Sequence, residues 1–204
     1  MNEFFDKIYC INLDKRTDRW NESLIEFEKL QLNVERVSAI DGSKLKNNTN
    51  IKNGALALTL TVNQIIDEAI SENLNRILIL EDDVIFTDKI KDFSDMITEL
   101  PDDWDMVSFG GNHNTHCGSL PPIKVNDNFN KLYNTYSAHA IGISSSGLAL
   151  IKGKLLEKLL EIDVLYAEIQ KTDNVYCFSE LLAYQRPSYS DIEDRVVNYN
   201  NLIK

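Results

Sequence analysis

The stretch RILILEDDVIF, residues 76–86, decides the fold and poses the main chemical question. Its apolar run from Ile77 to Leu80 is typical of a buried strand. Three adjacent carboxylates, Glu81, Asp82 and Asp83, follow this run directly and repel one another. A strand that ends in clustered negative charge needs either solvent or a cation around its tip.

Strand and helix patterns alternate on the N-terminal side of this stretch. Residues 7–12 (KIYCIN) and 34–40 (VERVSAI) have the short apolar runs of strands, and Asp41-Gly42 then indicates a turn. Two amphipathic helices are predicted between the three strands, because apolar residues recur there at helical spacing. The first series is Trp20, Leu24, Phe27 and Leu30, and the second is Leu58, Val62, Ile65, Ile66, Ala69 and Ile70.

The order strand, helix, strand, helix, strand predicts an α/β domain whose mixed, largely parallel sheet is flanked by helices. Further on we expect a helix at about 88–100, strands at 104–111 and 137–144, and a helix to residue 160. The end of the chain, 163–204, is expected to combine a helix, a short strand at VYCF and an irregular acidic tail. At 204 residues, this organisation fits a single domain.

Charge and cysteine content narrow the class of protein. The chain has 21 Lys and Arg against 32 Asp and Glu, and its formal net charge of −11 argues against nucleic acid as a partner. A nucleotide ligand remains compatible, because a bound cation can reverse the local sign. Three widely spaced cysteines, Cys10, Cys117 and Cys177, match no disulfide or zinc spacing and are typical of buried core residues in a reducing compartment.

The chain shows no secretory signal at its start and no run of about 20 apolar residues that predicts a transmembrane segment. We therefore expect a cytoplasmic protein, which can also work at the inner face of a membrane.

The acidic cluster has two interpretations. Charged residues commonly cap a strand at the surface, and that alone could explain the triplet. Alternatively, the carboxylates bind Mg²⁺ or Mn²⁺, hard cations that select carboxylate oxygens and keep positions open for phosphates. On an extended segment Glu81 and Asp83 would point to the same side, with Asp82 opposite, and so offer two ligands to one ion.

The triplet belongs to a set of four short pieces of sequence. They are residues 11–20 (INLDKRTDRW), 38–42 (SAIDG), 78–84 (LILEDDV) and 189–192 (YSDI). In this order, over nearly the whole chain, the pieces resemble glycosyltransferase family 25, which includes bacterial lipooligosaccharide galactosyltransferases and collagen galactosyltransferases. The resemblance implies a GT-A-like nucleotide-sugar fold, with a nucleotide-binding part at about 1–110 and an acceptor-side part at about 111–204.

The resemblance also implies roles for individual residues. The predicted nucleotide-side residues are Asn12, Asp14, Arg16, Arg19 and Asp82. The predicted ligands of Mn²⁺ or Mg²⁺ are Glu81 and Asp83, with Asp191 as a further ligand to metal or donor, and Asp163 is the candidate catalytic base or acceptor contact. The implied reaction is metal-dependent, inverting transfer of a hexose, galactose or glucose, from a UDP-sugar to a hydroxyl of a glycan or glycoconjugate.

The chain departs from the family at one place. Many relatives carry Gly-Glu-x-Gly-Cys-x-x-Ser-His ahead of the second helix, where this chain has NGALALTLTV, residues 53–62. Because the Ser-His pair is absent, two alternatives stay open: a different sugar or acceptor, and a non-catalytic protein that binds a sugar nucleotide or a glycan. A phosphohydrolase with a strand-end acidic cluster is a third hypothesis.

Other patterns have ordinary explanations beside functional ones. Arg16 and Arg19 could be solvated charges and Asp14 a helix N-cap, although cations are unfavourable near a helix N-terminus unless an anion binds there.

A zinc site of His113, His116 and Cys117 lacks a fourth ligand. His139 is expected to be a hydrogen-bonded core residue. The tyrosines that could stack on a sugar or base are Tyr184, Tyr189 and Tyr199.

Overall fold

The computed structural model describes residues 1–113, 121–192 and 194–198. Its main sheet, within those residues, has eight strands in the order β2-β1-β3-β8-β5-β9-β7-β6. The strands are β1 (Lys7–Asn12), β2 (Val34–Ser38), β3 (Arg76–Glu81), β5 (Met106–Ser108), β6 (Ile123–Lys124), β7 (Phe129–Lys131), β8 (Ala140–Ser144) and β9 (Val175–Phe178). All of them except β8 and β7 run in the same direction, so the predicted mixed, largely parallel sheet is confirmed.

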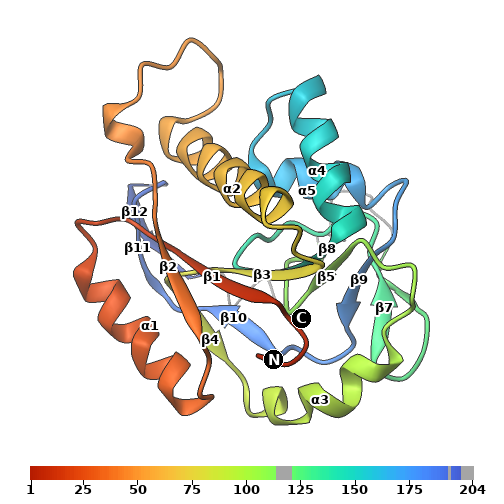
Figure 1. Cartoon of the computed structure of the whole chain (residues 1–204). Helices are drawn as coiled ribbons and strands as arrows, with labels where there is room; N and C mark the ends of the chain where they lie inside the picture. The colour runs from red at the N-terminus through yellow and green to blue at the C-terminus, as the bar shows by residue number, and fades with distance from the viewer. Residues whose placement is uncertain (114–120, 193, 199–204) are drawn as a thin grey trace.

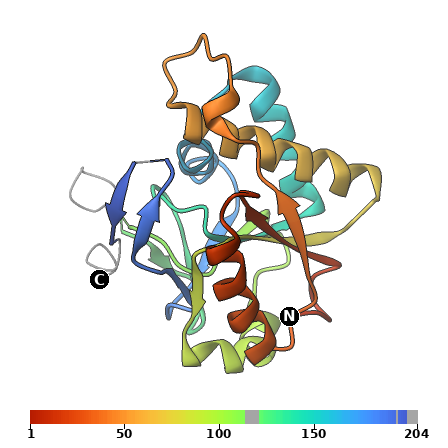
Figure 2. The same cartoon turned by 90° about the vertical axis from the view of Figure 1, so that its left-hand side faces the viewer.

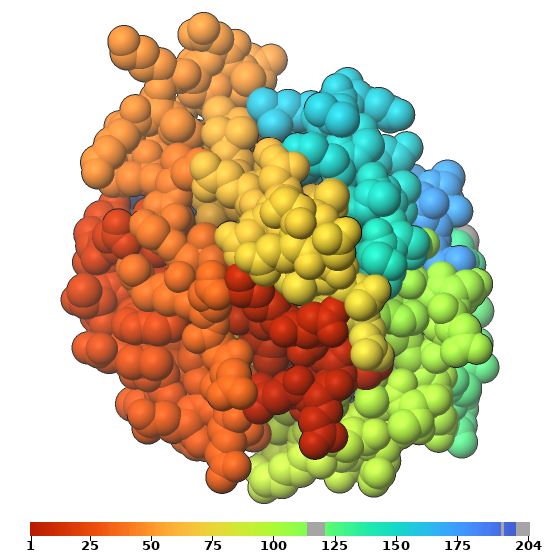
Figure 3. All heavy atoms as spheres, in the orientation of Figure 1, coloured from red at the N-terminus to blue at the C-terminus, as the bar shows by residue number. Residues whose placement is uncertain are grey.

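Helices cover both faces of this sheet (Figure 1). The helices are α1 (Thr17–Lys29), α2 (Asn53–Ser71), α3 (Phe93–Met96), α4 (Ser145–Glu157) and α5 (Ile162–Ile169), with short 3₁₀ turns at Gly42–Lys44, Asp88–Asp92 and Ile97–Glu99. Side chains of α1 and α3 share one apolar cluster and those of α2, α4 and α5 share the other. On the surface, α2 in yellow and α4 in cyan lie side by side (Figure 3). Among the described residues, no helix has both the length and the apolarity needed to cross a membrane.

Strand β3 is buried on both faces, as its apolar run predicts. The exposed fractions of Ile77, Leu78, Ile79 and Leu80 lie between 0% and 2%, and alternate residues enter the two apolar clusters. Burying each such side chain contributes roughly 1.5–3 kcal/mol relative to leaving it in water. The strand is therefore a rigid support for the acidic residues at its end.

Helix α1 turns a different face to the core from the one its apolar spacing indicates. Its buried residues are Arg19, Ser23 and Phe27, whereas Leu24 is 37% exposed. The apolar face predicted from Trp20, Leu24, Phe27 and Leu30 is thus only partly correct. The reason is that Arg19 and Ser23 find polar partners in the residues that follow β3.

Two short antiparallel pairs lie outside the main sheet. Strand β4 (Val84–Phe86) pairs with β10 (Ala183–Gln185), and β11 (Ser188–Ser190) pairs with β12 (Arg195–Val197). Figure 2 shows the strands from the end of the chain, in blue, beside the main sheet. The tail predicted to be irregular is therefore ordered through residue 192 and at 194–198, and it lies against the segment that follows the EDD triplet.

Candidate active site

A cavity of about 750 Å³ opens at the carboxyl ends of β1 and β3. The register pairs Ile11 of β1 with Glu81 of β3, so the two strand ends lie side by side. The start of α2, the start of α5 and the segment after β10 form the rest of the wall. A Cβ on Gly54 would lie 3.0 Å from the Cα of Ile192, so the C-terminal segment packs directly on the first turn of α2. The location agrees with the rule that ligands of α/β sheets bind at strand carboxyl ends.

The acidic triplet bends at the wall of this cavity. Strand β3 ends at Glu81, and Asp82 and Asp83 form a turn before β4. The extended geometry considered for the triplet, with Asp82 opposite Glu81 and Asp83, is therefore not adopted. Instead, Nη2 of Arg19 lies 2.6 Å from Oδ1 of Asp82 and 2.7 Å from Oδ2 of Asp83. One guanidinium group thus neutralises part of the repulsion in the triplet.

Hydrogen bonds from both ends of the chain fix the backbone of this turn. Oγ of Ser23 donates to the carbonyl of Asp82 at 2.8 Å, and Nη2 of Arg186 donates to the same oxygen at 3.1 Å. The backbone N–H of Arg186 donates to the carbonyl of Asp83 at 2.7 Å. Helix α1 and the segment after β10 therefore hold one turn between them, although they are far apart in the sequence.

Asn12 supports the turn from behind the cavity wall. It is 1% exposed, and its Nδ2 donates to Oδ2 of Asp82 at 2.6 Å and to the carbonyl of Arg16 at 3.0 Å. Its Oδ1 accepts hydrogen bonds from Nε and Nη2 of Arg36 at 2.9 and 2.7 Å. Asn12 does not line the cavity, and so it positions the loop after β1 relative to Asp82.

Two carboxyl groups at the cavity, those of Asp83 and Glu81, are desolvated. Oδ1 of Asp83 is buried and accepts no hydrogen bond from any described residue. Glu81 lines the cavity beside it, and burial, followed by the charge of Asp83, raises the pKa of Glu81 to about 8. Burial likewise raises the pKa of Asp82 to about 6, against the lowering effect of Arg19. Unsatisfied, desolvated carboxylates are unfavourable unless a cation or a proton compensates them.

These residues fit a hard divalent cation. Mg²⁺ characteristically binds one or two protein carboxylates and completes its shell with phosphate oxygens and water. Glu81 and the free oxygen of Asp83 supply such a pair. Across the described ranges, no group of three or more His, Cys, Asp or Glu side chains gathers around one metal position, so substrate and water would provide the remaining ligands.

Arg16 and Asp191 are tied to each other beside the cavity. Nη1 of Arg16 lies 2.6 Å from Oδ2 of Asp191, and the other side of its guanidinium binds Asp18. Nζ of Lys15 lies 3.3 Å from Oδ1 of Asp191. Lys15 and Asp191 line the cavity, whereas Arg16 does not.

Asp14 does not line the cavity. It bonds Nη2 of Arg36 and Oγ of Ser38, both at 2.8 Å, and these contacts hold the pKa of its carboxyl below the ordinary value. The N-cap of α1 is Arg16, so the alternative interpretation of Asp14 as the N-cap is wrong. Asp14 joins the ends of β1 and β2.

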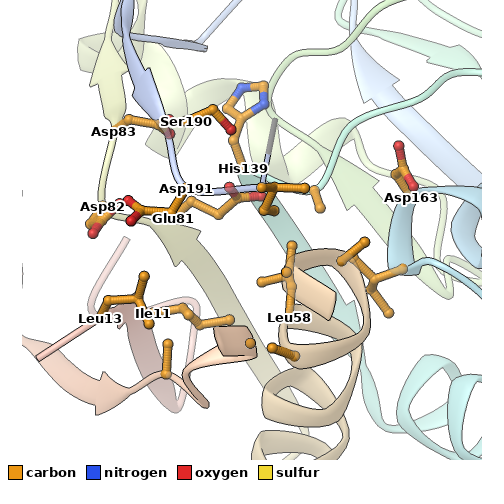
Figure 4. Close-up of a pocket in the computed structure, with 18 of the residues that line it drawn as sticks. Ile11, Leu13, Leu58, Glu81, Asp82, Asp83, His139, Asp163, Ser190 and Asp191 are labelled. Atoms are coloured by element: carbon orange, nitrogen blue, oxygen red, sulfur yellow. The ribbon is translucent and has the colours of Figure 1, made fainter. Parts of the chain in front are cut away.

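Asp163 stands apart from the other carboxylates, across the cavity near Leu58 (Figure 4). It lies in the first turn of α5, where its Oδ1 accepts a hydrogen bond of 2.8 Å from the N–H of Val164. Burial raises its pKa above the ordinary value. A partly buried carboxylate with a raised pKa on an open cavity can accept a proton.

The structure adds residues that the sequence interpretation did not place at the site. Lys15 stands between the predicted Asp14 and Arg16, and Arg186 follows β10. His139, expected in the core, is 2% exposed and contacts Oγ of Ser137 at 2.6 Å, but it also reaches the cavity. In the sequence, these residues could be found only through their closeness to the predicted motifs. The pairing of β4 with β10, which precedes Arg186, has no sequence pattern of its own.

Among the described residues, the remaining candidates do not form a second site. Nδ1 of His113 contacts Oγ1 of Thr135 at 2.8 Å, and His116, Cys117 and Tyr199 lie outside the described residues. The hydroxyl of Tyr189 donates to Asp194. Cys10 and Cys177 are buried and free, as predicted for core cysteines.

One family model and several solved structures are similar to this chain. The family model described as "Glycosyltransferase family 25 (LPS biosynthesis protein)" matches residues 5–116. The solved structure of A197 from STIV is similar in fold, with a TM-score of 0.50 and 17% identity over 88% of this chain and 85% of that one. No curated protein sequence matches the chain.

Two solved glycosyltransferases are also similar at lower scores. One is involved in glycosylation of the major capsid of PBCV-1, with a TM-score of 0.43 and 10% identity over 84% of this chain and 92% of that one. The other is the galactosyltransferase LgtC in complex with donor and acceptor sugar analogs, with a TM-score of 0.46 and 11% identity over 96% of this chain and 93% of that one.

The protein is a glycosyltransferase with a mixed α/β fold. Because the family model covers more than half of the chain, the protein belongs to glycosyltransferase family 25. The resemblance carried by the DKR and EDD segments is confirmed at the level of family, because both segments lie within residues 5–116. The YSDI segment lies outside the matched residues and stays a prediction.

Proposed function

We propose that the protein transfers a hexose, galactose or glucose, from a UDP-sugar to a hydroxyl of a glycan or glycoconjugate, with Mn²⁺ or Mg²⁺ as cofactor and with inversion at the anomeric carbon. The observation that carries this proposal is one cavity lined by Glu81, Asp83 and Asp163, in which Asp163 lies away from the acidic triplet (Figure 4) and one buried oxygen of Asp83 has no partner among the described residues. Sugar transfer itself follows from family membership. The proposal adds the metal ion, the nucleotide, the sugar and the stereochemistry of the transfer.

Glu81 and Asp83 would hold the metal, which stabilises the negative charge that develops on a leaving diphosphate. Asp191 remains the predicted further ligand to metal or donor. Its two oxygens contact Arg16 and Lys15, so it would join the metal only after rearrangement of that pair.

The donor diphosphate is proposed to lie beside Lys15. This ammonium lines the cavity and is half-exposed, so it can exchange its contact with Asp191 for a phosphate oxygen. Arg16, behind it, would contact the diphosphate only if Asp191 moves away. Asn12, Asp14 and Asp82 would act on the nucleotide side mainly by holding the loops after β1 and β3 in place.

Asp163 is proposed as the base. Its carboxylate takes the proton of the acceptor hydroxyl while that oxygen bonds to the anomeric carbon. The bond from the anomeric carbon to the diphosphate oxygen breaks in the same displacement, and UDP leaves with the electron pair. A single displacement of this kind inverts the configuration. The proposed division into a nucleotide part, about 1–110, and an acceptor part, about 111–204, places Asp163 on the acceptor side.

One observation favours a second candidate, a non-catalytic protein that binds a sugar nucleotide or glycan. The segment that replaces the family's Ser-His motif forms the start of α2, and Gly54, Ala55 and Leu58 line the cavity there. These side chains offer no titratable group to a reacting sugar.

An assay with a panel of UDP- and GDP-sugars and glycan acceptors separates the candidates. The proposed function predicts turnover that chelation by EDTA abolishes and that added Mn²⁺ restores. Tight donor binding by calorimetry without turnover on any acceptor would favour the second candidate, and rapid cleavage of simple phosphate esters would favour a phosphohydrolase. Activity that is unchanged by EDTA would contradict the metal requirement.

A further inference from the structure

Arg19 is occupied within the protein, unlike a typical donor contact. The residue is 9% exposed, and its Nη2 lies within 2.7 Å of an oxygen of each of two adjacent carboxylates, Asp82 and Asp83. Lys15 has a side chain that is 52% exposed and lines the same cavity. Arg19 and Lys15 therefore have different roles.

The contacts of Arg19 decide which oxygen of Asp83 is left without a partner. Because Oδ2 binds the guanidinium, the carboxyl is oriented with Oδ1 left over, and Oδ1 is the buried oxygen that has no partner. Arginine suits this task because its guanidinium group is rigid and planar, so that Nη2 is held in one place between the two carboxylates, whereas a lysine ammonium group lies on a flexible stem. Helix α1 fixes the position of the guanidinium, since Ser23, one turn further on, bonds the carbonyl of Asp82.

We propose that Arg19 is a positioning residue for the metal: it holds the turn at Asp82 and Asp83 so that the free oxygen of Asp83 faces the cavity beside Glu81. The inference rests on the proposed function, because it assigns the metal to Glu81 and Asp83. It replaces the prediction that Arg19 contacts the nucleotide.

Charge and geometry make opposite predictions for the loss of this arginine. A cation close to a metal site repels the metal, so its removal should tighten Mn²⁺ binding if charge is all that matters. If Arg19 orients Asp83, its removal leaves the carboxyl free to turn, and Mn²⁺ binding weakens. The sign of the change in affinity therefore distinguishes the two roles.

The test measures Mn²⁺ alone, by electron paramagnetic resonance of the free ion and by calorimetry, on the full chain. Arg19→Gln should weaken Mn²⁺ binding at least tenfold, and Arg19→Lys, which keeps the charge, should also weaken it. Arg76→Gln is the control, because Arg76 begins β3 at the end opposite Glu81 and contacts the ring of Phe4. This control should bind Mn²⁺ like the unchanged protein.

A second variant covers the case in which Arg19→Gln does not fold. Arg19→Gln combined with Asp82→Asn removes the buried charges as a pair, and it should still bind Mn²⁺ at least tenfold more weakly. Unchanged or tighter binding by the folded variants would overturn the positioning role while leaving the metal assignment intact. Absence of Mn²⁺ binding by the unchanged protein would overturn the metal assignment and this role together.

Discussion

The two walls of the cavity differ in how completely their polar groups are paired. On the wall formed by β1, β3 and α1, hydrogen bonds and ion pairs hold Asn12, Arg19 and Asp82, and one oxygen of Asp83 is left without a partner. The wall formed by α2 and α5 presents apolar side chains, such as Leu58 and Ile162, together with Asp163. Lys52, Asn53 and Glu161 line the cavity at the starts of these two helices.

The difference separates two tasks. A network of buried, mutually oriented charges stabilises charge where it develops, because little reorganisation is needed during the reaction. A less densely charged wall that carries Asp163 suits a sugar hydroxyl that must lose a proton. The predictions below change one wall at a time.

The largest effect is expected from the paired wall. Asp83→Asn removes a proposed metal ligand but keeps a side chain of the same shape, so kcat should fall by about 10²–10³-fold with the fold retained. Asp88→Asn is the control, because its side chain is 99% exposed on a 3₁₀ turn. Transfer rates and thermal melts should be measured together. Full activity of Asp83→Asn would remove the basis for a metal at this wall.

Loss of the base on the other wall should be almost as damaging. Asp163→Asn should lower kcat by about 10²–10³-fold, the range typical of a general base, and leave the donor Kd unchanged. A base works only when ionised, so activity should be lost as pH falls through the pKa of Asp163. Burial raises that pKa above the ordinary value, so the loss should begin at a higher pH than for an exposed aspartate. A pH–rate profile that keeps its acidic limb in the variant would assign the limb to another group.

A smaller effect is expected at the cavity mouth. Lys15→Gln should raise the donor KM by about fivefold, because an exposed ion pair contributes on the order of 1 kcal/mol, and the effect should shrink at high salt. Lys91→Gln, on the 3₁₀ turn Asp88–Asp92, is the matched control. An unchanged KM across donors would show that the diphosphate lies elsewhere.

The smallest change is expected from trimming an apolar side chain on the wall formed by α2 and α5. Leu58→Ala enlarges the cavity without altering any charge, so it should change the acceptor KM by about two- to fivefold, which is less than the effect of a methylene group in a closed hydrophobic pocket. The donor Kd should stay constant in calorimetry. A donor Kd that changes more than the acceptor KM would exchange the proposed roles of the two walls.

The sequence predicted the elements whose patterns are local. Strand β3, helix α2 and the α/β order follow from short apolar runs and helical spacing, and these were confirmed. The carboxylates were placed at a strand end for the same reason. Arg16 and Arg19 could not be told apart, because the partner of Arg16 is Asp191 and that of Arg19 is the turn after β3.

What could not be predicted depends on contacts over long distances in the chain. Strands β4 and β10 have three residues each and pair across about a hundred residues of sequence, and so short a run carries no periodicity. The buried face of α1 was misassigned because its polar residues are satisfied by that distant turn. Leu24 is exposed and Arg19 is buried, which is the reverse of the usual burial of leucine and exposure of arginine. Such a reversal marks a functional region.

The most direct test of a metal at Glu81 and Asp83 is anomalous diffraction at the manganese edge, from crystals grown with Mn²⁺ and UDP. The account predicts a single strong peak in the cavity, within about 2.0–2.4 Å of oxygens from both side chains and in contact with the diphosphate. UDP bound without a peak there, or a peak at another place, would contradict it.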